Sequence, residues 1–291
     1  MTASFLRFLN KKAFGLLVLA ALLAGCSTTA LTPGANSRPE SEENLFAASP
    51  ANIASLTEVV QRNPNDPQTY NMRGSVLGLA GRHDEALSDF NKAVSLDAQY
   101  AQAYANRALV YRQMNNLDLA LADYNQAVTI DPGYSGAYLG RGIVYRQSKQ
   151  AVPALQDFNK AIAIRPDTAE AYYNRGLLYQ GQRQHQFAID DFSTAVGLAS
   201  QQAEPFIARG LSYIAVGDFK SAVSDFDEAV QLEPQSLQAW TSRGLAHERL
   251  GDKEKAAGSY ARAMNIRQDY DPARSGFARV GGKSGQTYQT F

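Results

Sequence analysis

From residue 67 to residue 270, the pattern of apolar, small and polar positions repeats every 34 residues. Each copy holds two runs of apolar residues at helical spacing, separated by a short polar turn. Position 32 of the repeat is proline in three copies, at Pro132, Pro166 and Pro234. Because proline cannot continue a helix, the pattern predicts a pair of antiparallel helices in every copy. Six copies fit without a gap: 67–100, 101–134, 135–168, 169–202, 203–236 and 237–270.

Aromatic and small residues hold fixed positions in this repeat. Positions 4 and 24 are aromatic in all six copies, positions 20 and 27 are alanine in all six, and position 8 is glycine or alanine. Large rings at 4 and 24 can fill the space between helices, while small residues at 8 and 20 let the backbones approach closely. This pattern resembles the tetratricopeptide repeat, and the resemblance covers 204 of the 291 residues.

The resemblance implies an all-α fold, a right-handed superhelical solenoid of six helix-turn-helix repeats with terminal capping helices. Residues 50–66 match only the second helix of a repeat, so we expect an N-terminal capping helix there. Residues 271–291 begin with a segment that we expect to form a C-terminal capping helix over Phe277. The end of that segment is expected to be a disordered tail.

An arginine stands at position 7 of every copy, on the flank of the apolar stripe of the first helix. Position 23, on the second helix, is aspartate in the first five copies and serine, Ser259, in the sixth. We expect an ion pair between the two helices of each repeat, with two hydrogen bonds from the guanidinium to the carboxylate. The five pairs are Arg73 with Asp89, Arg107 with Asp123, Arg141 with Asp157, Arg175 with Asp191 and Arg209 with Asp225.

Two alternatives remain open for these arginines. Each could instead meet the aspartate of the preceding repeat, and Arg73 would then lack a partner, whereas Arg243 lacks one if the pairs form within a repeat. The six arginines could also form a ladder that binds anions. Five of them have an acid within reach, so a structural role is favoured.

Charge and cysteine content narrow the class of protein. Lysine plus arginine and aspartate plus glutamate are equal at 28 each, so no nucleic acid or other polyanion is expected as partner. Cys26 is the only cysteine, which excludes a disulfide within the chain and argues against a thiolate metal site.

The N-terminal segment has the layout of a secretory signal, predicted over residues 1–25. Residues 1–12 carry three basic residues and no acid, and the apolar run 13–23 is shorter than a membrane-spanning helix. The sequence LAGC at 23–26 resembles a bacterial lipobox, which implies cleavage before Cys26 and lipid attachment to its thiol. An ordinary signal peptide or an uncleaved anchor is the alternative.

The stretch that follows the signal has no helical or strand period. Residues 26–49 are rich in Ser, Thr, Ala, Pro and Glu, and we expect them to form a lipidated flexible tether. Ser27, and not aspartate, follows the cysteine, and by resemblance to bacterial lipoproteins this implies sorting to the outer membrane. The expected location is therefore the periplasmic side of the outer membrane of a Gram-negative bacterium, with the membrane reached through the lipid anchor.

No constellation of catalytic residues emerges from the sequence. His83, His185 and His247 lie in different repeats, and none has a second histidine or cysteine at ligand spacing. The motifs of serine hydrolases, zinc proteases and phosphate-binding loops are absent. We expect no enzyme activity, no metal, no cofactor and no small-molecule substrate.

The resemblance also implies that the first helices line a concave groove, mainly through positions 2, 5, 6, 9, 12 and 13. Arg112 and Arg146 both stand at position 12 and have no position-23 aspartate to answer them. With the neighbouring amides and one tyrosine they could hold an acidic or extended segment of an envelope protein. An ordinary solvated face is the open alternative. The expected partner-binding residues are Asn106, Arg112, Gln113, Arg146, Gln147, Tyr173, Asn174 and Gln180.

The sequence as a whole resembles the tetratricopeptide lipoproteins of Gram-negative bacteria. This implies a cell-envelope scaffold or adaptor that binds proteins through its concave groove. The alternative is a pilotin-like lipoprotein that assembles a secretion system or pilus, and an envelope enzyme is the less favoured third hypothesis. The sequence leaves the oligomeric state open.

Overall fold

The computed structural model describes residues 48–283 and 285–288. The signal peptide, Cys26 and nearly all of the tether lie outside the described residues. The first helices of the six repeats are α3 (Pro67–Leu79), α5 (Ala101–Gln113), α7 (Ser135–Gln147), α9 (Ala169–Gly181), α11 (Ala203–Val216) and α13 (Leu237–Leu250). The second helices are α4 (His83–Leu96), α6 (Leu117–Ile130), α8 (Ala151–Ile164), α10 (His185–Leu198), α12 (Phe219–Leu232) and α14 (Lys253–Ile266).

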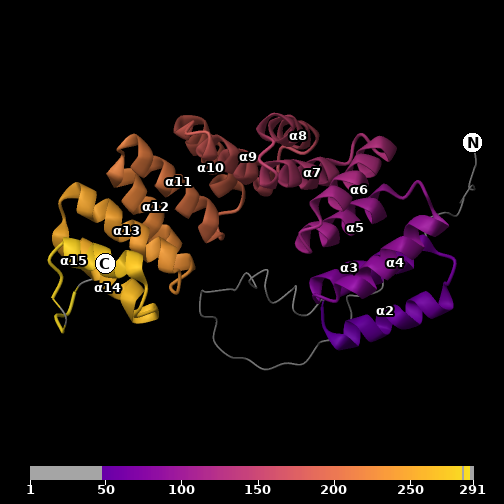
Figure 1. Ribbon diagram of the computed structural model, residues 1–291, viewed down its shortest axis with the longest axis horizontal. Coiled ribbons are helices and arrows are strands. Elements are labelled where there is room, and N and C mark those ends of the chain that lie inside the picture. Colours follow the sequence, from indigo (N-terminus) through magenta and orange to yellow (C-terminus); the bar gives the residue numbers. More distant parts are fainter. Residues whose placement is uncertain (1–47, 284, 289–291) are drawn as a thin grey trace, which may run out of the picture.

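These helices and two terminal ones follow one another around an arch (Figure 1). Each second helix packs on the first helix of its own repeat and on that of the next repeat. First helices of neighbouring repeats also contact each other, from α3 with α5 to α13 with α15 (Asp271–Arg279). The predicted fold class, an all-α solenoid of helix-turn-helix repeats, is confirmed. The described residues contain no strand.

Rings and small residues hold the two helices of a repeat together. All six alanines at position 20 and all six at position 27 are fully buried. The ring at position 24 lies against the glycine at position 8: a Cβ atom added to Gly176 would stand 2.7 Å from Phe192. Larger residues at position 8 would therefore push the helices apart.

The turn between the two helices of every repeat uses one left-handed residue at position 15. The residues are Gly81, Asn115, Lys149, Arg183, Gly217 and Gly251, with φ between 58° and 84°. Glycine adopts this conformation without strain, whereas Lys149 and Arg183 carry a modest penalty. Their repeats nevertheless close with the same hydrogen bonds, Gln150 N to Tyr145 O and Gln184 N to Tyr179 O.

Single helices cover both ends of the solenoid. At the N-terminal end, α2 (Pro50–Arg62) packs on α3 through Ile53 and Val60. At the C-terminal end, α15 buries Phe277, and the Tyr288 ring packs edge-on against that phenylalanine at 5.6 Å. Tyr288 belongs to the segment for which the sequence predicted disorder. Within the described ranges, no helix combines the length and the apolar character that crossing a membrane requires.

Candidate functional site: arginine rungs and a concave groove

Arginine and aspartate meet within each of the first five repeats. The guanidinium Nε donates to one carboxylate oxygen and Nη2 donates to the other, at 2.7 to 2.9 Å in every pair. The five aspartates are buried, and the arginines are more exposed than they are. The partner is thus the aspartate of the same repeat, and the alternative of pairing with the preceding repeat is not what the structure has.

The same arginines also reach back to position 25 of the preceding second helix, a contact that the sequence analysis missed. Arg107 Nη1 donates to the Asn91 side-chain oxygen at 2.7 Å, and Arg141 repeats this contact with Asn125 at 2.8 Å. The equivalent acceptors for the other arginines are Thr57, Asn159 and Ser193. Each arginine is therefore a rung that joins three helices of two repeats. Its signal was visible: position 25 is polar in the first five copies, directly after the ring at position 24.

In the sixth repeat, the acid that pairs with the arginine comes from the preceding repeat. Arg243 is nearly fully buried; its Nε donates to Asp227 at 2.6 Å and its Nη1 donates to Ser259 at 2.7 Å. Asp227 stands at position 25 of the fifth repeat. The expectation that Arg243 lacks a partner when the pairs form within a repeat was wrong, because an acid at position 25 replaces the missing acid at position 23.

Electrostatics agree with a structural role for the rungs. Hydrogen bonding to the aspartate raises the pKa of the five arginines from Arg73 to Arg209. Burial raises the pKa of Asp225, although Arg209 pulls it the other way. Two short hydrogen bonds from Arg209 to Asp225 nevertheless hold a charged pair, whose attraction is largely offset by lost hydration. These guanidinium groups already have their anions and are not available to a ligand.

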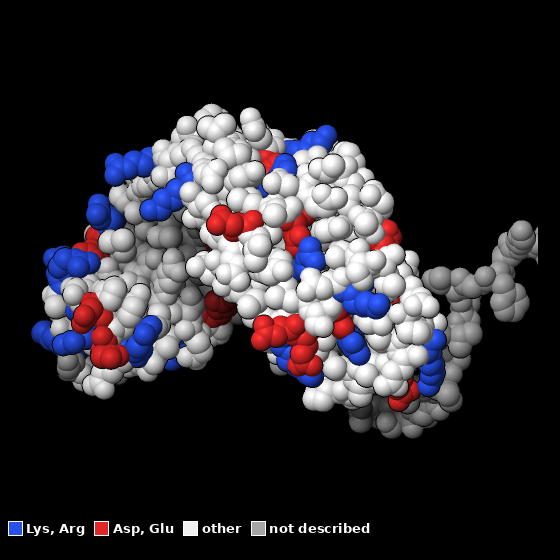
Figure 2. Space-filling model, turned by 45° about the vertical axis from the view of Figure 1, so that its right-hand side comes forward, with Lys and Arg blue, Asp and Glu red and all other residues white. Residues whose placement is uncertain are grey.

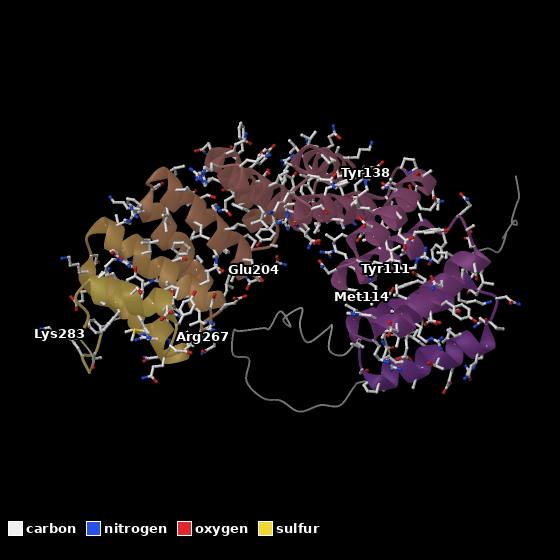
Figure 3. All side chains as sticks on the ribbon, viewed as in Figure 1. Tyr111, Met114, Tyr138, Glu204, Arg267 and Lys283 are labelled. Atoms are coloured by element: carbon white, nitrogen blue, oxygen red, sulfur yellow. The ribbon has the colours of Figure 1, made fainter. Side chains whose placement is uncertain are left out.

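A cavity of about 1200 Å³ opens on the inner side of the arch, between the second and fifth repeats. Figure 2 shows the hollow, and Figure 3 labels Glu204, which lines it from α11. Its lining comes from concave positions of α5, α7, α9 and α11 and from the turns between repeats. Both predicted groove arginines, Arg112 and Arg146, line it.

The wall formed by α5 and α7 is positively charged. Arg146 Nη2 donates to the side-chain oxygen of Asn174 at 3.2 Å, and Asn174 is in turn held by the carbonyl of Glu170 at 2.9 Å. The Nε atoms of Arg112 and Arg146 are buried without a hydrogen-bond partner. Burial lowers the pKa of Arg146, the charge of Arg112 lowers it further, and Tyr173 opposes them. In the described part of the chain no carboxylate pairs with either arginine.

The opposite wall is acidic. Glu204 begins the first turn of α11, and Glu233 follows the end of α12; both line the same cavity. Burial raises the pKa of Glu233, and the charge of Glu204 raises it further. Neither glutamate forms an ion pair with a described residue. The sequence analysis did not single out these acids because they come from positions 2 and 31 of one repeat and meet only through the fold.

The eight predicted partner-binding residues fall into two groups. Arg112, Arg146, Gln147, Tyr173 and Asn174 line the cavity. The other three lie outside its lining. Asn106 donates to Asn71 and Ser75, Gln180 donates to Ala208 O and Ser212, and Gln113 is exposed. Asn106 and Gln180 therefore join neighbouring first helices.

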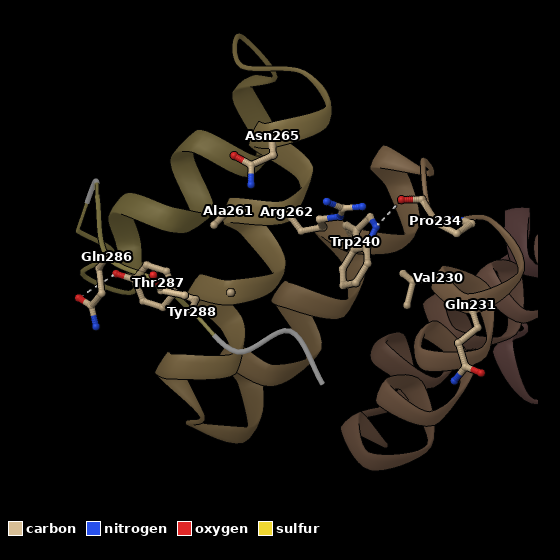
Figure 4. Close-up of a pocket in the computed structure, with 11 residues that line it drawn as sticks. Val230, Gln231, Pro234, Trp240, Ala261, Arg262, Asn265, Gln286, Thr287 and Tyr288 are labelled. Atoms are coloured by element: carbon tan, nitrogen blue, oxygen red, sulfur yellow. Dashed lines mark hydrogen bonds between the residues drawn. The ribbon is translucent and has the colours of Figure 1, made fainter.

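A second cavity, of about 640 Å³, lies near the C-terminal end, between α12, α14 and residues 286–288 (Figure 4). The Trp240 ring closes one side of it and its indole N–H donates to Pro234 O at 3.0 Å. Arg262 is its only charged lining residue. No group of three or more His, Cys, Asp or Glu side chains that could hold a metal ion occurs among the described residues.

Comparison with protein-family models finds tetratricopeptide repeats along much of the chain. Models of this repeat match residues 101–134, 169–202 and 207–272, and a further one, described as TPR repeat, matches 74–115 and 153–182. Repeats of this family generally serve as non-catalytic scaffolds that bind proteins. No curated protein matches the sequence.

Solved structures show the same architecture. A chain of the APC/C hetero-tetramer Cut9-Hcn1 matches with a TM-score of 0.70 and 16% identity, over 83% of this chain and 48% of that one. This chain thus spans about half of that relative. The pilF protein of Pseudomonas aeruginosa matches with a TM-score of 0.67 and 18% identity, over 75% and 99%. YrrB, described as a TPR protein with an unusual peptide-binding site, matches with a TM-score of 0.56 and 26% identity, over 64% and 96%. The described part of the chain is a solenoid of tetratricopeptide repeats.

Proposed function

We propose that the protein is an interaction scaffold that holds an extended segment of another protein in its concave groove. The observation that carries this proposal is the cavity of about 1200 Å³ into which Arg112 and Arg146 face without a described carboxylate. Solenoids of this kind use extended concave surfaces to bind partners. The similarity to a repeat protein with a peptide-binding site supports the same use here.

The experiment that tests the groove is a double charge reversal, Arg112→Glu with Arg146→Glu. Both side chains line the cavity, so capture of partner proteins from an envelope extract should fall at least tenfold while helical content stays unchanged. The matched control is Lys92→Glu with Lys160→Glu, which makes the same charge change at two exposed positions on second helices outside the cavity. Full capture by the groove variant, or equal loss in the control, would move the binding site away from the concave face.

We also propose that the scaffold is tethered in the cell envelope through a lipid on Cys26. The basic start, the short apolar run and the LAGC sequence support this, as does the following serine for the outer membrane. Cys26→Ala should abolish lipid labelling and release the exported protein from membranes. Unchanged membrane association of this variant would remove the lipoprotein proposal but leave the groove untouched.

The captured protein would also separate two roles. A protease or a wall hydrolase favours an adaptor, whereas a secretin or pilus subunit favours the pilotin-like assembly factor.

A further inference from the structure

The cavity carries a pair of like charges on each of two opposite walls, besides Glu170 on α9 and Arg165 and Asp167, which pair with each other at 3.7 Å. Arg112 and Arg146 come from successive first helices, and the positive charge of one disfavours the charged form of the other. Glu204 and Glu233 form the corresponding acidic pair. Like charges held close together raise the free energy of the folded chain unless something neutralises them.

The two walls do not neutralise each other. Among the described residues, no ion pair joins either arginine to either glutamate. The rung arginines behave differently, since the first five each bind an aspartate through two short hydrogen bonds. The chain thus supplies an acid at position 23 to five of its position-7 arginines, but none to Arg112 or Arg146.

The distance between the walls sets the size of a ligand that could meet both. Glu204 lies on α11, two first helices beyond α7, which carries Arg146. Packed helices are about 8–10 Å apart, so the axes of α7 and α11 are separated by roughly 16–20 Å. An extended chain covers about 3.3 Å per residue, and this span therefore corresponds to about five or six residues. A single amino acid or other small zwitterion is too short.

The signs of the walls restrict the ligand further. A polyanion would meet Arg112 and Arg146 but would be repelled by Glu204 and Glu233, and a purely basic segment meets the reverse problem. An extended backbone also suits the amides beside the arginines, because Gln147 is exposed and lines the cavity.

We propose that the groove selects a protein segment of mixed charge, with an acidic side chain over Arg112 and Arg146 and a basic side chain about five or six residues away beside Glu204 and Glu233. This inference rests on the proposed function and specifies the partner's chemistry. The acid of the segment supplies the carboxylate that the chain gives to its position-7 arginines. Its base neutralises the glutamates, and both like-charge pairs are relieved at once.

The test is selection from a library of random dodecapeptides with the purified full-length chain. The expected consensus contains one acidic and one basic position at a fixed separation of about five or six residues, in one preferred order. The swap variant, which combines Arg112→Glu and Arg146→Glu with Glu204→Lys and Glu233→Lys, should select the opposite order. The control variant Lys92→Glu with Lys160→Glu should keep the original order.

The outcomes separate this inference from the proposed function. A consensus that is only acidic, only basic or apolar, or an order that the swap leaves unchanged, overturns mixed-charge selection while the groove remains a peptide site. Selection of no peptide by the folded chain overturns both.

Discussion

Tyr124 in the second repeat and Tyr260 in the sixth occupy the same position, 24, where the other four repeats have phenylalanine. Each tyrosine packs against a glycine at position 6 of the following element, Gly140 for Tyr124 and Gly276 for Tyr260. A Cβ atom at either glycine would clash with the phenol ring. The other repeats pair phenylalanine with Asn, Ala or Ser at that position. The two junctions therefore share the same packing of a tyrosine against a glycine.

The two junctions differ in how they treat the charge at position 12. At the C-terminal end this residue is Glu248, which accepts a hydrogen bond from the Tyr260 hydroxyl at 2.7 Å and two from Arg279 at 2.7 and 2.8 Å. Hydrogen bonding to Arg279 lowers the pKa of Glu248. In the middle of the solenoid position 12 is Arg112, and the residue equivalent to Arg279 is Ile143.

Only one of the two junctions supplies an opposite charge to its position-12 residue. Tyr124 is deeply buried beside Arg112; burial raises its pKa to about 12, and the guanidinium only partly opposes this. The phenol therefore stays neutral and cannot serve as the counter-ion of Arg112. In the last repeat, Arg279 of α15 pairs with the position-12 residue Glu248. In the second and third repeats, the position-12 arginines line the cavity instead. We interpret the unpaired arginines at position 12 as the groups that bind a partner.

The largest expected effect comes from removing the carboxylate of a paired arginine. Asp157→Ala leaves Arg141 half-buried without its carboxylate and should lower the free energy of unfolding by about 3 kcal/mol. In the Arg141→Leu background the same change should have a much smaller effect, because no charge is orphaned. Guanidinium unfolding of the unchanged chain, the two single variants and the double variant measures the coupling. If the two destabilisations simply add, Arg141 and Asp157 do not interact. The contrast between paired rung arginines and unpaired cavity arginines would then fail.

The next effect tests the packing of tyrosine against glycine that the two junctions share. Gly140→Ala places a methyl group against the Tyr124 ring and should destabilise the chain by about 1–3 kcal/mol. Adding Tyr124→Phe should recover part of this loss, because it removes the hydroxyl oxygen, one of the three Tyr124 atoms nearest to that methyl group, and because Phe192 packs beside Ala208 at the equivalent junction. Thermal melting of the single and double variants provides the measurement, with Gly276→Ala as the matched change at the other junction. No recovery in the double variant would mean that the hydroxyl is not what requires the glycine.

A smaller effect should appear with pH at the C-terminal end only. Position 11 is tyrosine in repeats two to five but His247 in the sixth, where it is buried near Arg243, Asp227, Asp252 and Lys255. Burial, with help from Arg243, lowers the pKa of His247 below its ordinary value of 6.5. The unfolded chain then binds the proton more readily, so stability is complete above pH 6.5 and declines as the pH falls below it.

His247→Tyr, which copies the other repeats, should remove this part of the pH dependence. Melting temperatures of both proteins between pH 7.5 and pH 5.5 check it. An unchanged difference in melting temperature across that range would show that His247 does not gain a proton on unfolding.

The sequence was enough to predict the solenoid because ring, alanine and proline positions recur at one fixed spacing. The pairing of positions 7 and 23 could be anticipated for the same reason, since both residues belong to one hairpin. The Tyr124–Gly140 contact could not, because it joins two repeats: the ring lies on α6, and the glycine lies on α7 of the following repeat. The acidic wall also escaped prediction, since Glu204 and Glu233 stand near opposite ends of the fifth repeat and approach each other only when its two helices, α11 and α12, pack together.

The smallest expected effect is a gain in stability, and it bears most directly on the unpaired arginines of the cavity. Arg146→Gln copies position 12 of the fourth repeat, where Gln180 donates to the carbonyl of Ala208 and to Ser212 at 2.9 Å. The change removes the repulsion between Arg146 and Arg112 and the buried Nε without a partner, so unfolding should cost about 0.5–1 kcal/mol more. For a chain of this size, that is a rise of about 1–4 °C in melting temperature. The control Arg141→Gln removes a closed charge instead and should lower the melting temperature. If Arg146→Gln lowers it as well, Arg146 is another structural rung, and the middle repeats hold no charge in reserve for a partner.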